Sequence, residues 1–224
     1  MSDFEAEKTE IEALTVEVYA AHLKDSGVEG SAEALAEFQA LSDADKETFL
    51  ELLHDEETLK EFLVESSTER IEAAGTPVEI PIAKGVTVVH EAGADLVEPE
   101  AGDGDVSTSA LSPGRWESWY RVTQKILGVT VTRLRINLSY TTNGSRITKT
   151  HKVWGERTNF NLVVRLSTHN LSHWVSSGRG YGQLTWRGTI GGTIKGVPIR
   201  VDIDKRHRIE VDKNGYRSGY LRNI

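Results

Sequence analysis

Two histidines, His169 and His173, lie four residues apart in the segment HNLSH. On a helix this spacing places both imidazoles on one face, where they can share a zinc ion. A metalloprotease helix also carries a glutamate between its histidines as the general base, and this chain has only asparagine, leucine and serine there. We therefore interpret the pair as exposed histidines in a polar loop, and we predict neither a metal site nor a cofactor.

Four carboxylates near the C-terminus alternate along the sequence: Asp202 with Asp204, and Glu210 with Asp212. Alternate residues of a strand share a face, so each pair sets two carboxylates side by side, as in a glycosidase or a cation site. Three basic residues stand between the pairs: Lys205, Arg206 and Arg208. Cross-strand ion pairs explain these acids without catalysis. The sequence therefore predicts no catalytic residue, and a hydrolase that uses the aspartates and histidines is the least favoured alternative.

Other enzyme signatures are missing from the sequence. The chain has no G-x-S-x-G segment, and GRGYG at 178–182 lacks the strand-to-helix context of a phosphate-binding loop. The DGD of 103–105 is similar to part of a calcium loop but lacks the downstream glutamate ligand. The absence of cysteine excludes disulfides, thiolate metal sites and cysteine nucleophiles. The sequence thus favours a protein that is not an enzyme.

The net charge of −8 combines two halves of opposite sign. Residues 1–110 hold 28 acidic and 6 basic residues, a net charge of −22, whereas residues 111–224 hold 6 acidic and 20 basic residues, a net charge of +14. All five tryptophans lie in the second half. Basic and aromatic residues interleaved in this way favour an anionic partner, such as a cell-envelope polymer, lipid headgroups or nucleic acid.

The basic residues that could bind such a partner fall in two segments. DKRHR at 204–208 is predicted to form a hairpin tip that presents its bases to solvent, and an earlier strand carries a row of two arginines. The candidate anion-binding residues are Arg133, Arg135, Lys205, Arg206 and Arg208. The alternative is that these residues only cover the outward faces of strands and keep the sheet edges from pairing with other chains.

The elements that position these residues differ between the two halves. Ser31 and Ser42 are helix-capping residues in the first half, and apolar residues follow each of them at helical spacing. Further helical segments are expected around these residues: Ile11, Leu14 and Val18, and Leu59, Phe62 and Leu63 after Asp55. The first part is thus predicted to be a small acidic unit of helices.

The second half is predicted to be β-rich. Apolar and polar residues alternate along 116–127 and 132–140, and Asn143-Gly144 and Asn214-Gly215 mark hairpin turns. The stretch 168–182 is the one long interruption, with room for a short helical turn. We expect the core to contain Trp119, Leu134, Ile136 and Leu138. Several short strands with turns between them predict an antiparallel sandwich, so the fold class is α+β, a helical region followed by a β-sandwich-like domain.

An acidic stretch separates the two parts. Residues 91–114 hold six acidic residues, four glycines and no base, a composition that cannot bury enough apolar surface to become ordered. We predict an acidic helical region at 1–75, an extended segment and acidic linker at 76–114, and a basic antiparallel β domain at 115–224. Two alternatives are a strand at 77–89 that joins the second domain's sheet, and a long acidic loop inside one domain.

The opposite charges of the two parts favour contact between them. Tethered domains meet at an effective concentration on the order of millimolar, so even a weak attraction keeps them docked. We therefore predict a non-enzymatic secreted binding or toxin-like β domain that an acidic pro-region masks. The alternatives are a structural or assembly protein of a phage or cell surface, and a single fold in which the helices are permanent.

Three segments resemble a group of small secreted proteins from actinobacteria: WYRVTQKILGVTVTRLRINLSYTTNG, SHWVSSG and NGYRSGYLRN, in that order. Those proteins pair an acidic helical N-terminal region with a compact β domain. The resemblance implies a bacterial protein in an extracellular or cell-surface setting, and it carries over no catalytic residue. No apolar run is long enough to span a membrane. The start, MSDFEAEKTE, is acidic where a signal peptide is basic, so either the chain is not exported by that route or the sequence is that of a processed form.

Overall fold

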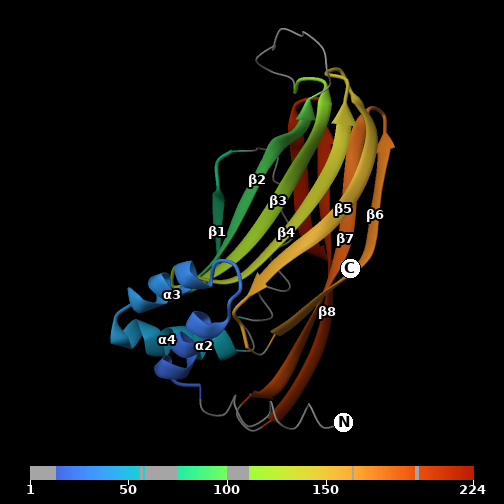
Figure 1. Cartoon of the computed structure of the whole chain (residues 1–224). Helices are drawn as coiled ribbons and strands as arrows, with labels where there is room; N and C mark the ends of the chain where they lie inside the picture. The colour runs from blue at the N-terminus through green and yellow to red at the C-terminus, as the bar shows by residue number, and fades with distance from the viewer. Residues whose placement is uncertain (1–13, 56–57, 59–74, 100–110, 163, 195–196) are drawn as a thin grey trace.

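The computed structural model describes residues 14–55, 58, 75–99, 111–162, 164–194 and 197–224. Within them, three short helices precede nine antiparallel strands that form two sheets (Figure 1). The predicted α+β class and sandwich-like arrangement are confirmed at this level. No helix in the described part of the chain is long and apolar enough to cross a membrane.

The helices are α2 (Val16–Asp25), α3 (Ser31–Gln39) and α4 (Asp43–His54). Ser42 caps α4 as predicted, because its hydroxyl accepts a hydrogen bond from the backbone N–H of Asp45 at 3.1 Å. The cap of α3 is Gly30, in the left-handed conformation with a φ of 86°, and Ser31 is the first helical residue rather than the cap. Of the helix expected at Ile11, Leu14 and Val18, Val18 lies in α2, whereas Ile11 lies outside the described residues. Leu59, Phe62 and Leu63 also lie outside them.

The strands run in chain order through the two sheets. The first sheet contains β1 (Val78–Ala83), β2 (Val86–Pro99), β3 (Gly114–Ile126), β4 (Val129–Thr142) and β5 (Ile147–Asn159). The second sheet contains β6 (Val164–Ser176), β7 (Arg179–Ile194), β8 (Val197–Asp212) and β9 (Gly215–Asn223). Hairpins turn at both predicted Asn-Gly sites, where Gly144 and Gly215 have φ values of 81° and 97°.

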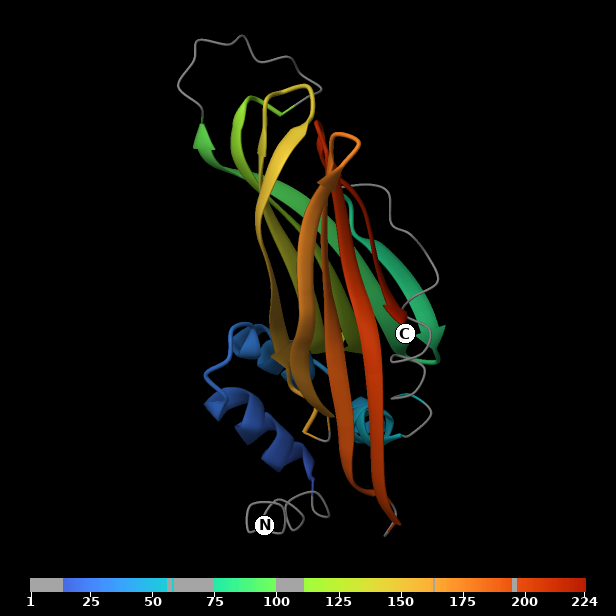
Figure 2. The same ribbon diagram turned by 90° about the vertical axis from the view of Figure 1, so that its right-hand side faces the viewer.

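The two sheets enclose an apolar core, and Figure 2 shows the second sheet lying in front of the first. From β4 the core receives Leu134, Ile136 and Leu138, as the alternation predicted. The facing side chains of the second sheet include Leu184, Trp186 and Ile209. Each long strand therefore places its apolar side chains on the face that points to the other sheet, and these faces together form the core of the sandwich.

Trp119 is not part of this core, contrary to expectation. Its neighbour Tyr120 is fully buried between the sheets, and Trp119 lies on the outer face of the first sheet. Gly93 makes room for the indole there, because a Cβ at that position would lie 2.8 Å from Cζ2 of Trp119. The alternation along β3 was predicted with the wrong phase, since adjacent aromatic residues offer one large side chain to each face.

A second apolar core joins the helices to the turn between β3 and β4. The helices contribute Tyr19, Leu23, Phe38, Phe49 and Leu53, and the strand side contributes Ile126, Val129, Val131 and Phe160. Each of these side chains is at most 1% exposed. The described helices are thus packed on one end of the sandwich, as Figure 1 shows.

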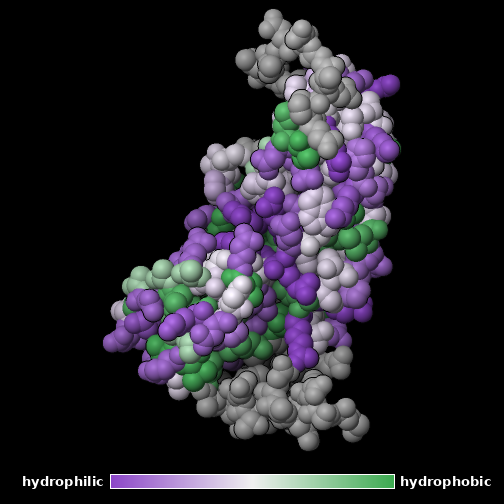
Figure 3. Space-filling model, in the orientation of Figure 1, coloured by the Kyte–Doolittle hydropathy of each residue, from purple (hydrophilic) through white to green (hydrophobic). Residues whose placement is uncertain are grey.

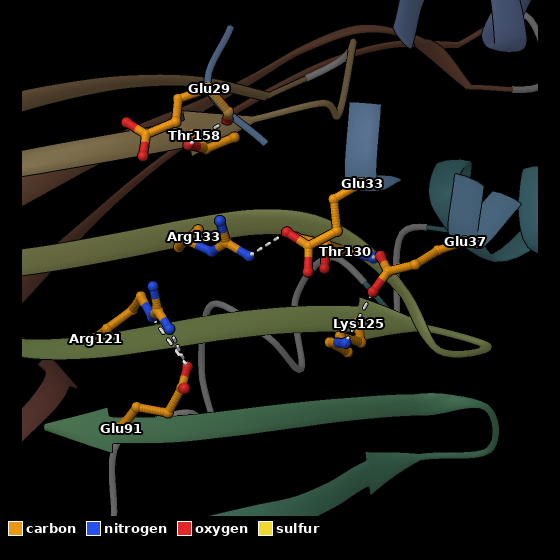
Figure 4. A network of polar contacts seen from close by, with 9 residues as sticks. All are labelled: Glu29, Glu33, Glu37, Glu91, Arg121, Lys125, Thr130, Arg133 and Thr158. Atoms are coloured by element: carbon orange, nitrogen blue, oxygen red, sulfur yellow. Dashed lines mark hydrogen bonds and ion pairs between the residues drawn. The ribbon is translucent and has the colours of Figure 1, made fainter. Parts of the chain in front are cut away.

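Polar contacts surround this second core (Figure 4). The carboxylate of Glu37 on α3 accepts hydrogen bonds from the backbone N–H of Thr130 at 2.8 Å and from Nζ of Lys125 at 3.1 Å. Glu33, one turn earlier, lies 3.5 Å from Nη2 of Arg133. Acidic side chains of α3 therefore contact basic side chains of β3 and β4.

Two stretches that were predicted to be irregular form strands instead. Residues 91–99 complete β2 and pair with β3, so the linker predicted from residue 91 is wrong over this range, and residues 100–110 lie outside the described residues. Within this strand Glu91 forms an ion pair of 2.8 Å with Arg121 of β3 (Figure 4). The expected interruption at 168–182 is the β6–β7 hairpin, which turns at Ser177 and Gly178.

Candidate anion-binding face

The five candidate residues are distributed over three environments. Arg133 and Arg135 lie on β4 in the first sheet, whereas the other three lie on β8 in the second sheet. DKRHR is not a hairpin tip, because it runs through the middle of β8, where both β7 and β9 pair with it. Side chains alternate along β8, so Lys205 lies on one face of the sheet and Arg206 and Arg208 lie on the other.

Lys205 points into the sandwich instead of into solvent. Only 2% of the residue is exposed, and burial lowers the pKa of its amine from 10.5 to about 7. An amine buried between the sheets cannot contact an anion at the surface. Lys205 is therefore removed from the set of candidate anion-binding residues.

The two arginines of the first sheet are held by neighbouring side chains. Arg133 contacts Glu33 of α3, and Nε of Arg135 donates a hydrogen bond to Oδ1 of Asn137 at 2.7 Å. Arg135 also lies 3.7 Å from Glu156 and stacks on Trp119 at 4.8 Å. The charges of Arg133 and Arg135 are thus offset by carboxylates of the same chain.

The two remaining candidates lie with a third arginine on the outer face of the second sheet. Arg206 is directly opposite Arg222 of β9, and Arg208 follows Arg206 by two residues on the same face. Like charges directly opposite one another on neighbouring strands are destabilising. Across the residues that the structure describes, no ion pair joins any of these three guanidinium groups to a carboxylate. Positive charge therefore accumulates at this point of the sheet.

Aromatic rings lie beside these arginines. Trp174 of β6 and Tyr181 of β7 stack with ring centroids 5.2 Å apart and an interplanar angle of 12°. The guanidinium carbon of Arg208 lies 5.2 Å from the first ring and 5.1 Å from the second, and that of Arg222 lies 4.3 Å from the ring of Tyr220. We call this set the arginine–aromatic face: Trp174, Tyr181, Arg206, Arg208, Tyr220 and Arg222.

Stacking holds the guanidinium groups in place without neutralising them. A cation over an aromatic ring is stabilised by about 0.5–1 kcal/mol at an exposed site and keeps its hydrogen-bond donors. Two apolar residues of β6 are also exposed, Leu171 by 50% and Val175 by 38%. Figure 3 shows apolar side chains at the right-hand edge of the molecule. The face therefore offers fixed donors and flat rings on one side of the sheet.

Acidic residues of the same sheet are paired elsewhere. Asp204 accepts two hydrogen bonds of 2.8 Å from Arg187, and these bonds lower the pKa of Asp204. Glu210 lies 3.1 Å from both Arg179 and Arg217. Both acids thus form cross-strand ion pairs, but with these arginines and not with the expected Lys205, Arg206 and Arg208.

The two histidines of HNLSH do not form a helical pair. They lie on β6 on either side of a bulge. The ring of His169 shares a hydrogen bond with Ser167, and the ring of His173 shares one with Thr150. No group of three or more metal-ligating side chains occurs in the described part of the chain.

Sequence reasoning found two residues of the arginine–aromatic face and missed four. Tyr220 and Arg222 follow the predicted turn at Asn214-Gly215, but they were missed because DKRHR was expected at a hairpin tip and not on the strand that pairs with them. Trp174 and Tyr181 were missed because 168–182 was expected to be irregular. Treating this stretch as a hairpin would have brought both rings to the same sheet.

Comparisons with protein-family models, with curated proteins and with solved structures find no match for this chain.

Proposed function

We propose that this chain is a non-enzymatic binding protein whose arginine–aromatic face binds an anionic polymer. The observation that carries the proposal is the cluster of Arg206, Arg208 and Arg222, which no carboxylate within the described residues compensates. Guanidinium groups bind sulfate, phosphate and carboxylate through paired charge-assisted hydrogen bonds. A bound anion would also relieve the repulsion between the two arginines that oppose each other.

The spacing of the arginines supports a polymer over a single small anion. Opposite residues on neighbouring strands are about 5 Å apart, and alternate residues on one strand are about 7 Å apart. Groups repeated along a sulfated or phosphorylated chain can therefore meet several guanidinium groups at once. The rings of Trp174 and Tyr181 would pack against the less polar parts of such a chain.

The test uses the full-length protein and a fluorescent sulfated polysaccharide at low salt. We expect Arg206→Gln combined with Arg222→Gln to weaken binding by about tenfold or more, since each charged contact of this kind contributes on the order of 1 kcal/mol. The matched control combines Lys152→Gln with Arg157→Gln, which removes the same charge from exposed positions of β5. Equal losses in both variants would show that only net charge matters, and the proposal would then be wrong.

Parallel titrations identify the kind of anionic partner. Anionic lipid vesicles and single-stranded DNA serve as the other two probes, each measured at two salt concentrations. Binding should weaken with salt for every probe, because the Debye length falls to about 8 Å at 0.15 M. If the partner is a polymer, the loss of the two arginines should weaken binding of the polysaccharide or the DNA more than binding of the vesicles.

A second hypothesis treats the acidic helices as a removable mask, in an extracellular setting such as the resemblance implies. The contacts of Glu33 with Arg133 and of Glu37 with Lys125 favour it, because acidic side chains of α3 cover basic side chains of the β part. These contacts lie on the first sheet, so a mask of this kind would act on Arg133. Cleavage between the halves during secretion of the protein would support this hypothesis.

A further inference from the structure

A cluster of buried titratable groups lies between the two sheets, apart from the arginine–aromatic face. The first sheet contributes His90 from β2 and Tyr120 from β3, and the second contributes His207 and Lys205 from β8. None of the four is more than 3% exposed. Histidine and lysine are seldom buried so completely, so their position in a sandwich core needs a physical account.

Direct contacts link these groups across the sandwich. Nδ1 of His90 and the hydroxyl of Tyr120 share a hydrogen bond of 2.7 Å. The ring of Tyr120 meets the ring of His207 edge to face, with centroids 5.1 Å apart. On the other side of His207, the indole N–H of Trp186 donates a hydrogen bond to Nδ1 at 3.0 Å. The chain of contacts therefore connects β2 and β3 with β7 and β8.

The contact with Trp186 requires a neutral His207. Because Nδ1 accepts the indole hydrogen, the ring proton must be on Nε2, and this atom is buried without a hydrogen-bond partner. Protonation of the ring would place a second hydrogen on Nδ1, directly against the indole N–H. It would also create a positive charge, and repulsion from a protonated His90 or Lys205 opposes it.

The other titratable groups beside the cluster do not offset such a charge. Tyr120 stacks on Tyr216 of β9, with ring centroids 5.9 Å apart. Burial raises the pKa of Tyr120, so its phenol carries no charge that could offset the imidazolium. The β4 side of this core is apolar, with Leu134 and Ile136.

We propose that this cluster is an acid-sensitive clamp, which holds the two sheets together while its imidazoles are neutral and releases them when the imidazoles take up protons. Nothing in this inference depends on the arginine–aromatic face. It assigns a conformational role to the polar groups of the core, and it predicts that the sandwich opens in acid rather than binding a ligand there.

The titration of the imidazoles has the sign that such a clamp needs. Burial lowers the pKa of His207 to about 3 and that of His90 to about 4, from an ordinary value of 6.5. Between pH 6.5 and these values the unfolded chain binds more protons than the folded one, so stability falls as the pH falls. The pKa of Lys205, about 7, lies below its unfolded value of 10.5, so its own effect is confined to higher pH.

The experiment measures denaturant unfolding of the full chain at pH 6.5, 6.0 and 5.5. This range lies above the pKa values of ordinary carboxylates, so the histidines dominate the titration. We expect the unfolding equilibrium constant to rise by up to about tenfold per pH unit for each buried histidine. A change of less than threefold between pH 6.5 and 5.5 would overturn the proposal.

Variants assign the effect to the cluster. In His207→Gln and His90→Gln the side chain keeps a hydrogen-bonding group but does not titrate, so each should lose a large share of the pH dependence. A smaller share remains with His22 of α2, because burial lowers its pKa as well. His169→Gln, at an exposed histidine of β6, should keep the wild-type dependence. If a core variant fails to fold, NMR of the wild-type protein gives the test instead, because the ring signals of the histidines report their protonation. Two imidazoles that remain neutral at pH 5 support the clamp, and two that titrate near pH 6.5 contradict it.

Discussion

Trp119 and Tyr120 show how a single step along a strand decides between core and surface. The sequence predicts that alternate residues of β3 share a face, and the structure confirms this. The sequence alone does not show which of two adjacent aromatic residues points inward, because both are large and partly apolar. That choice depends on the opposite sheet, where Gly219 leaves room for the ring of Tyr120: a Cβ there would lie 2.6 Å from Cδ1.

We predict that Tyr120→Ala destabilises the protein far more than Trp119→Ala. Tyr120 fills the space between the sheets, and loss of a large buried aromatic side chain costs about 3–5 kcal/mol. Trp119 contacts the guanidinium groups of Arg121 and Arg135 on the outer face, so its loss should cost about 1–2 kcal/mol. Denaturant unfolding at pH 8 measures both, with Trp154→Ala as an outer-face control. Similar losses for the two variants would contradict this placement.

At the scale of elements, helix caps and hairpins were predictable where the signal is local. Ser42 caps α4 and both Asn-Gly pairs lie at turns, because a cap or a turn depends on a few neighbouring residues. The extent of β2 and β6 was not predictable. Glu91 and Glu98 of β2 lie opposite Arg121 and Arg115 of β3, although Asp95 lies opposite Glu117, and such pairing across strands is invisible to composition.

The contact between α3 and the β3–β4 hairpin gives a prediction at this scale. Burial alone would raise the pKa of Glu37, but hydrogen bonds from Thr130 and Lys125 outweigh it and lower the pKa. A carboxylate with a lowered pKa stabilises the folded state above its unfolded pKa of about 4.5, and this contribution is lost as the pH falls through the folded pKa. We therefore expect Glu37→Gln to destabilise the protein by about 1–2 kcal/mol at pH 7 and by much less near pH 3.

Denaturant unfolding at the two pH values measures this difference, and Glu33→Gln is the matched control. Glu33 lies on the same helix, but its side chain is 60% exposed and its distance to Arg133 is 3.5 Å. An exposed ion pair of this kind contributes about 0–1 kcal/mol. If Glu33→Gln were the more damaging substitution, the hydrogen bond from the hairpin backbone would not be the main polar contact.

Across the described residues the molecule has two apolar cores, one between the sheets and one between the helices and the β3–β4 hairpin. The charge split was visible in the sequence, and the candidate site followed from it in part, through Arg206 and Arg208. The position of the helices did not follow from it. Their place is set by apolar side chains around Phe160, and apolar packing depends on the fold more than on net charge.

Removal of residues 1–74 gives the last prediction, and it separates the mask hypothesis from permanent packing. The resulting chain keeps β1 and β2 but loses the helices that cover Ile126, Val129 and Phe160. We expect this chain to bind a hydrophobic dye and to aggregate at lower temperature than the full-length protein, because a newly exposed apolar surface drives association. Its binding to a sulfated polysaccharide at 0.15 M salt should change little, since the described helices make their ion pairs with the β part at Lys125 and Arg133 and not at the arginine–aromatic face. Dye fluorescence, light scattering and polysaccharide titration measure these outcomes. A truncated chain that stays monomeric and binds at least tenfold more tightly would instead support the removable mask.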